Sequence, residues 1–99
     1  MKTLTTIKKQ LQTLKPTLKK KYQVETIGIF GSYTRGEQKR KSDLDIIVEF
    51  SEPNDIDLFK FIELKLLLED ELHLKIDLLE KDTIKPRIKD QILQEIIPV

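Results

Sequence analysis

Residues 28–50 read GIFGSYTRGEQKRKSDLDIIVEF, and this stretch decides the fold because it holds the end of one strand, a loop and a second strand. The apolar, β-branched run over residues 24–30 stops at Gly31, which is typical of a strand that enters a tight turn. Over residues 44–50, apolar residues alternate with others at a period of two, which predicts the second strand. Asp43 and Asp45 stand at the head of that strand, and their mutual repulsion needs a chemical explanation.

Helical patterns lie on both sides of this stretch. Apolar residues at spacings of three and four predict a helix over residues 3–22 with one apolar face. Pro16 interrupts that pattern, so the segment is either two helices, with Pro16 in the first turn of the second, or one kinked helix. We expect a second helix over residues 55–72 with Asp55 as its cap, a third strand over residues 74–79, and a last helix over residues 87–97.

The order helix, strand, strand, helix, strand, helix predicts the fold class. In 99 residues it gives a single α/β (α+β) domain over residues 1–99, with a small mixed sheet of three to four strands and helices packed on one side. The second helix is apolar over more than half its circumference. Leu64 and Leu67 fall among its charged residues, so we expect them to offer a surface for a partner or for self-association.

Composition excludes several classes of function. The net charge of +1 gives no general attraction to nucleic acid or to an anionic membrane, so neither is an expected partner. The chain has no cysteine, which rules out disulfides and thiolate metal sites and fits a reducing compartment. No segment approaches the roughly 20 apolar residues of a membrane span, and the basic N-terminus lacks the apolar run of a signal peptide. We therefore expect a cytoplasmic protein.

Three strand-borne carboxylates are the candidate catalytic and metal-binding groups. Asp43 and Asp45 point to the same face of their strand, with Cα atoms roughly 6 to 7 Å apart. Asp77 has the same setting in the third strand, so all three converge if the two strands are neighbours. Three close anions need a cation or protons, and Mg²⁺ prefers carboxylate oxygens with ligand positions left for water and phosphate. Carboxylates at this spacing can also bridge two ions for an in-line phosphoryl displacement.

The Gly31-Ser32 pair is the candidate phosphate-binding turn. Glycine permits backbone angles that direct successive N–H groups toward one point, and the serine hydroxyl adds a donor. Arg35 and the basic residues of the following loop, Lys39, Arg40 and Lys41, would supply positive charge for a triphosphate.

Each of these features has a structural alternative. An Asp-x-Asp pair at a strand start commonly serves a turn, and a Lys-Arg-Lys run is commonly a solvated loop. Arg35 could simply pair with Glu37 or Asp43, and His73 is expected to be exposed and without a chemical role.

The combination, however, resembles the nucleotidyltransferase signature of the DNA polymerase beta superfamily. More narrowly, FGSYTRGEQKRKSDLDIIVEF is similar to the minimal nucleotidyltransferases, small prokaryotic proteins often encoded beside a HEPN-domain toxin as its antitoxin. The resemblance covers nearly the whole chain: FGS at 30–32, RG at 35–36, SDLD at 42–45 and KIDLL at 75–79. It implies the nucleotidyltransferase (polymerase beta palm-like) fold.

The resemblance also implies residue roles. Asp43 and Asp45 would bind the metals, and Asp77 would be the third carboxylate, acting as base toward the acceptor hydroxyl. Gly31 and Ser32 would hold the β and γ phosphates of ATP. Ser42 and Arg35 match the family pattern as further nucleotide-binding residues.

The resemblance favours an antitoxin that transfers AMP from ATP to a tyrosine of a HEPN toxin, with Mg²⁺ as cofactor. Two rival hypotheses stay open. In one, the protein is a binding module that neutralises its partner by contact alone. In the other, the acceptor is a small molecule such as an aminoglycoside.

Overall fold

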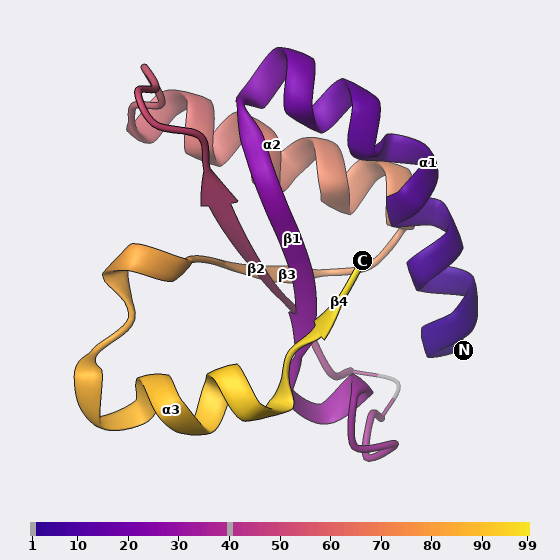
Figure 1. Cartoon of the computed structure of the whole chain (residues 1–99). Helices are drawn as coiled ribbons and strands as arrows, with labels where there is room; N and C mark the ends of the chain where they lie inside the picture. The colour runs from indigo at the N-terminus through magenta and orange to yellow at the C-terminus, as the bar shows by residue number, and fades with distance from the viewer. Residues whose placement is uncertain (1, 40) are drawn as a thin grey trace.

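A four-stranded mixed sheet organises the molecule (Figure 1). The computed structural model describes residues 2–39 and 41–99. The strand order is β3-β2-β1-β4, in which β1 is antiparallel to β2 and β4, and β2 is parallel to β3. The strands are β1 (Val24–Phe30), β2 (Leu44–Phe50), β3 (Ile76–Glu80) and β4 (Ile97–Pro98). Over the described residues, no helix has both the length and the apolar character to cross a membrane.

Two long helices, α1 (Leu4–Tyr22) and α2 (Leu58–Leu72), cover one face of the sheet, and the main core lies between them and the strands (Figure 1). From α1, Ile7, Leu11, Leu18 and Tyr22 are buried, in agreement with the predicted apolar face. Pro16 lies inside α1 as one continuous helix, so the two-helix alternative is wrong. On α2, Phe61 packs edge-to-face on Phe50 of β2 with ring centroids 6.4 Å apart, which fixes the helix on the sheet.

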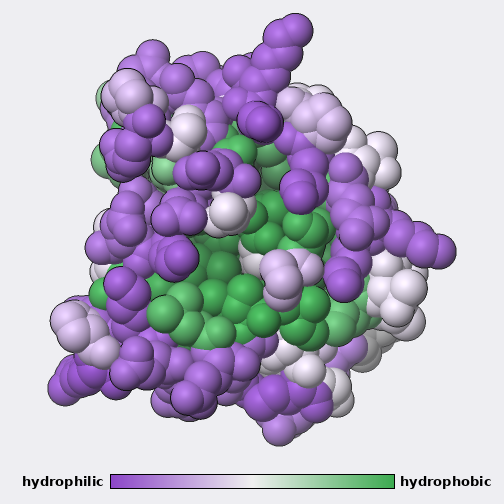
Figure 2. All heavy atoms as spheres, viewed as in Figure 1, coloured by the Kyte–Doolittle hydropathy of each residue, from purple (hydrophilic) through white to green (hydrophobic). Residues whose placement is uncertain are grey.

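The third helix, α3 (Pro86–Glu95), lies against the opposite face (Figure 1). A smaller apolar cluster joins it to the sheet through Ile92 and Ile96, which pack against Phe30, Ile47 and Ile84. The expectation that the helices pack on one side therefore holds for α1 and α2 but not for α3. Figure 2 shows an apolar, hollowed surface at the centre of this face with hydrophilic side chains around it. A hollow of about 310 Å³ between β1, β2 and α3 is lined by Ile27, Ile47, Leu93 and Ile96 among others.

Two expectations about α2 are corrected. Its cap is Asp57, whose Oδ1 accepts a hydrogen bond of 2.8 Å from the Lys60 N–H, and not Asp55. Leu64 is fully buried in the core and Leu67 is half-buried against it, so neither is the surface residue that we expected. The helix is apolar over more than half its circumference, so its sequence period does not by itself say which side meets the sheet.

Candidate functional site

Asp45 and Asp77 are direct partners across the parallel strands β2 and β3. In-register residues of adjacent strands share a face, so both carboxyl groups project from the same side of the sheet. The chain forces this orientation because Leu44 and Ile46 on either side of Asp45, and Ile76 and Leu78 on either side of Asp77, are buried in the main core. The predicted convergence of these two residues is confirmed. Asp43 directly precedes β2 and is exposed.

The Asp45 carboxyl group is under electrostatic strain. Its pKa is raised to about 6, first because partial burial removes water, and then because the negative charges of Asp77 and Asp43 oppose ionisation. A hydrogen bond between the Asp45 and Asp77 carboxyl groups raises the pKa further, and the positive charge of Arg35 lowers it. Both of the other predicted carboxylates therefore act on Asp45, and its site favours a bound cation or proton.

Gly31 lies directly against this carboxyl group. Its φ of +80° is a left-handed conformation that glycine adopts without strain. A Cβ atom placed at Gly31 would lie 2.1 Å from Asp45 Oδ2, so no larger residue fits there without moving the carboxylate. The predicted phosphate-binding turn and the predicted metal-binding residue are thus in contact.

The turn after β1 is a single 3₁₀ turn, Gly31–Tyr33, that its own backbone closes. The Ser32 carbonyl accepts hydrogen bonds from the N–H groups of Arg35 at 3.2 Å and Glu37 at 3.0 Å. The Thr34 hydroxyl donates to the Gly31 carbonyl at 2.7 Å. Ser32 is half-buried, so its position is fixed while part of it stays accessible.

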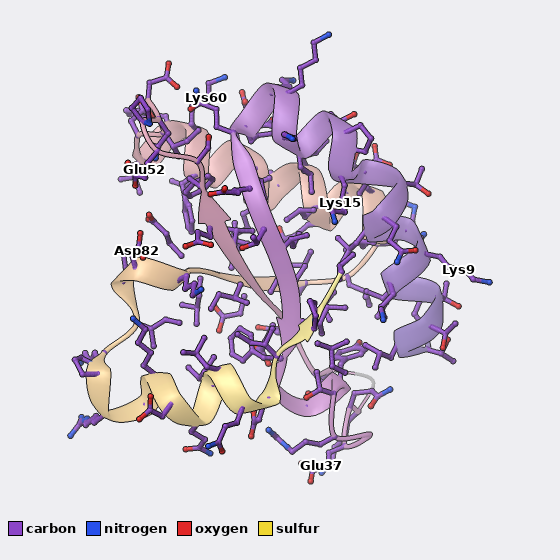
Figure 3. All side chains as sticks on the ribbon, viewed as in Figure 1. Lys9, Lys15, Glu37, Glu52, Lys60 and Asp82 are labelled. Atoms are coloured by element: carbon purple, nitrogen blue, oxygen red, sulfur yellow. The ribbon has the colours of Figure 1, made fainter. Side chains whose placement is uncertain are left out.

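Arg35 connects the turn to α3. Its Nε donates to Glu37 and its Nη1 donates to Glu95, each at 3.0 Å. Pairing with Glu37 was one of the predicted alternatives, and the hydrogen bond to Glu37 is the main reason why the pKa of Arg35 is raised. The sequence did not point to Glu95, because this contact spans 60 residues and has no local signal. Glu37 marks the position of this loop in Figure 3.

The loop before β2 carries the other predicted residues. The Ser42 Oγ accepts from the Lys39 N–H at 2.8 Å and the Ser42 N–H donates to the Lys39 carbonyl at 2.9 Å, so Ser42 closes a turn. Ser42 and Asp43 also line a pocket of about 650 Å³ with Lys41, His73, Leu74 and Lys75, which is large enough for a small-molecule ligand. His73 is exposed, as expected. Arg40 lies outside the described residues.

A complete metal site is not preformed. Within residues 2–39 and 41–99, no group of three or more His, Cys, Asp or Glu side chains is arranged to hold a metal ion by itself. The raised pKa of Asp45 nevertheless shows that this site would be stabilised by positive charge. Mg²⁺ commonly takes one or two carboxylates and completes its shell with water and substrate phosphates, so the donor set fits that ion.

Comparison with known proteins decides the family. A family model described as the nucleotidyltransferase domain matches residues 11–99. The chain belongs to this nucleotidyltransferase family. Protein adenylyltransferase MntA of Thermococcus cleftensis is 44% identical over 100 residues, which cover 100% of this chain and 98% of that protein.

Solved structures agree with this family. A protein assigned as a minimal nucleotidyltransferase has a TM-score of 0.81 at 32% identity, with 99% of this chain and 97% of that chain covered. A toxin-antitoxin structure with AMP-PNP has a TM-score of 0.72 at 25% identity, with 93% and 70% covered. The predicted family resemblance, fold class and enzyme class of this nucleotidyltransferase are confirmed.

Proposed function

We propose that this nucleotidyltransferase transfers AMP from ATP to a tyrosine hydroxyl of a partner HEPN toxin in the cytoplasm, and so acts as its antitoxin. The observation that carries the proposal is the contact between the Gly31 turn and Asp45, beside Asp77, in a chain 44% identical to a protein adenylyltransferase over its full length. The likeness to a toxin-antitoxin structure with AMP-PNP supports both the nucleotide and the kind of partner.

Some residues of the site would bind the nucleotide and the metal ion, and one would accept a proton. Gly31 and Ser32 hold the β and γ phosphates, and Ser42 and Arg35 orient the nucleotide. Asp43 and Asp45, with Asp77, would hold Mg²⁺. When bound, this ion supplies neutralisation of charge on the phosphates.

Asp77 accepts the proton of the acceptor hydroxyl. The hydroxyl oxygen then forms a bond to the α phosphorus, the bond from that phosphorus to the bridging oxygen of the β phosphate breaks, and pyrophosphate leaves. Asp77 suits this role because it is exposed, next to Asp45, and open to a residue presented by a partner.

The test is an incubation with a HEPN toxin whose gene adjoins that of this chain, or with the product of the neighbouring gene, together with ATP and Mg²⁺, followed by intact-mass measurement of that protein. We expect a gain of one or more AMP units with the wild-type chain and none with Asp45→Asn. Asp82→Asn, an exposed acid outside the site, is the matched control and should transfer normally. If the Asp43→Asn, Asp45→Asn double variant neutralises the toxin as well as wild type does, the protein acts by contact alone. Label from ATP on a small molecule and never on protein would favour the small-molecule alternative.

A further inference from the structure

The outer side of α2 carries an unusual amount of exposed apolar surface. Four large side chains form one stripe, with exposed fractions of 69% for Leu58, 82% for Phe59, 44% for Ile62 and 57% for Leu66. Their spacing places them together on one side of the helix, away from the buried Leu64, Leu68 and Leu72. We call these four residues the α2 stripe. A cluster of this kind on one helix marks an interaction site more often than scattered exposed residues do.

The α2 stripe adjoins the edge of the sheet at β3. A groove of about 340 Å³ lies between the beginning of α2 and β3, and its wall includes Leu58, Phe61, Leu78 and Leu79. β3 is an edge strand of the sheet, and it carries Asp77. A protein that covers the stripe and this groove would therefore be held on the element that presents Asp77.

Acidic residues flank the α2 stripe. Glu63 is one helical turn from Phe59, and Asp70 is one turn from Leu66, whereas Lys65 is the one basic residue at such a position. Glu69 is also one turn from Leu66, but it is half-buried and its carboxylate accepts a hydrogen bond from the Ile76 N–H. Lys60, which projects near the beginning of α2 in Figure 3, is 3.9 Å from Glu63 and pairs with it. The rim is therefore negative overall, and it favours an occupant with basic residues around an apolar centre.

A second copy of this chain fits the α2 stripe poorly. Two-fold pairing of the stripe with itself would place acidic rims against each other, whether the two helices run parallel or antiparallel. Among described residues outside α2, the exposed large apolar side chains are Ile88 and Leu93 of α3, and α1 presents none that could cover the stripe.

We propose that the α2 stripe, with its acidic rim and the adjoining β3 groove, is the docking surface for a helix of the acceptor protein whose apolar face is bordered by lysine or arginine. This inference rests on the proposed function for the identity of the acceptor. Helix-on-helix docking of this kind uses apolar anchors one turn apart, which is the spacing that the stripe presents. It would hold a protein acceptor at the edge strand β3, whose opposite face carries Asp77.

The test measures complex formation and AMP transfer in the same samples, with the full chain and the neighbouring HEPN protein. The Phe59→Asp, Leu66→Asp double variant should weaken binding about a hundredfold, because apolar anchors at an interface centre dominate affinity. Ile88→Asp is the matched control, since Ile88 is 42% exposed on α3, and it should bind as wild type does. Melting temperatures of both variants should stay near that of wild type, because the substituted side chains are exposed.

Charge reversal tests the chemistry of the partner. Glu63→Lys with Asp70→Lys should weaken binding about tenfold at low salt and remove most of its salt dependence. Unchanged or tighter binding by this variant would overturn the proposal that lysine or arginine borders the apolar face of the partner helix.

The remaining outcomes separate the two proposals. If the complex is lost in the stripe variant but the wild-type complex shows no AMP transfer, the docking surface is supported and the proposed AMP-transfer reaction is excluded. Transfer and binding that survive the stripe variant overturn the docking surface and leave the reaction. A wild-type chain that forms no complex with the HEPN protein, or a homodimer in sedimentation that the stripe variant dissociates, also overturns the docking proposal.

Discussion

Asp45 and Asp77 face the same side of the sheet from adjacent parallel strands, and the carboxyl group of Asp45 also lies against Gly31. This relationship brings together the turn after β1, strand β2 and strand β3. The chain leaves β2, forms α2 and then pairs β3 in parallel beside β2. The site therefore forms only when this part of the domain is folded.

Removing the Asp45 charge should stabilise the metal-free protein at neutral pH. The pKa of Asp45 rises from 3.8 in its ordinary state to about 6 in the fold, so between these values the unfolded chain has lost the proton while the folded protein keeps it. Stability is therefore lost as pH rises through this window, and the loss is complete above about pH 6. We expect Asp45→Asn to be more stable by about 1 kcal/mol above the window, a discounted value because solvent screens a half-exposed group.

Urea unfolding with a chelator present, at both ends of the window, measures this difference. The advantage of Asp45→Asn should shrink toward the acid end, and Asp82→Asn should show no such trend. An equal stability difference at both pH values would show that the charge of Asp45 is not the cause.

Magnesium should stabilise the protein through the same carboxylates. At tenfold excess over its dissociation constant, an ion bound only by the folded state adds about 1.4 kcal/mol, or a rise in melting temperature of about 5 °C or more for a domain of this size. The rise should be smaller at pH 5, where a proton competes for Asp45, and lost in Asp45→Asn. Thermal unfolding with and without Mg²⁺ measures it. An undiminished rise in Asp45→Asn would place the ion elsewhere.

Gly31→Ala should damage the site far more than Gly36→Ala does. Both glycines have positive φ, +80° and +70°, so alanine costs about 1 to 2 kcal/mol of backbone strain at either position. At Gly31 the new Cβ would also collide with Asp45, whereas nothing lies within 4 Å at Gly36. We expect Gly31→Ala to lose AMP transfer and Gly36→Ala to keep it, in intact-mass assays with unfolding measured in parallel. Equal activity of the two variants would show that the contact with Asp45 is unimportant.

The sequence predicted most of this site because the relevant patterns are local. The period of two in β2 defines which side chains are buried, and it therefore places Asp45 on the open face. The same reasoning applied to Asp77, and once the two strands are neighbours the convergence follows. The bounds of β1 and β2 were also predictable, because Gly31 and the turn before α2 interrupt the apolar runs.

The errors arise where tertiary contacts decide. β4 has two residues and exists through pairing with Gly28 and Ile29, so no period reveals it. The pairing of Arg35 with Glu95 depends on how α3 closes over the second face of the sheet. For α2, apolar residues cover more than half of the circumference, and the buried side includes Leu64, Leu68 and Leu72, with Phe61 packed on Phe50. That selection places Leu64 inside, the reverse of its expected position, and leaves Leu66 outside.

Alanine substitutions in α2 should confirm which side is buried. Leu64 is fully buried, so Leu64→Ala should destabilise the fold by about 2 to 5 kcal/mol through lost contacts and a cavity. Leu66 is 57% exposed, and Leu66→Ala should change stability by less than about 0.5 kcal/mol. Chemical denaturation of the two variants is a direct comparison, since they share residue type and helix. A larger effect for Leu66→Ala would reverse the assignment of the two sides.

Arg35 should contribute to nucleotide binding, although two carboxylates hold it in the free protein. Its side chain is shared between Glu37 and Glu95, and its charge already acts on Asp45, so it stands within electrostatic reach of bound phosphates. Loss of one charge-assisted hydrogen bond costs about 1.5 to 3 kcal/mol, which corresponds to roughly a tenfold to hundredfold rise in KM for ATP in Arg35→Ala. Glu95→Gln keeps the arginine and removes one competing carboxylate, so its KM should be equal or lower. Steady-state kinetics separate KM from kcat, and a rise in KM for Glu95→Gln equal to that for Arg35→Ala would mean that the arginine serves only to attach α3.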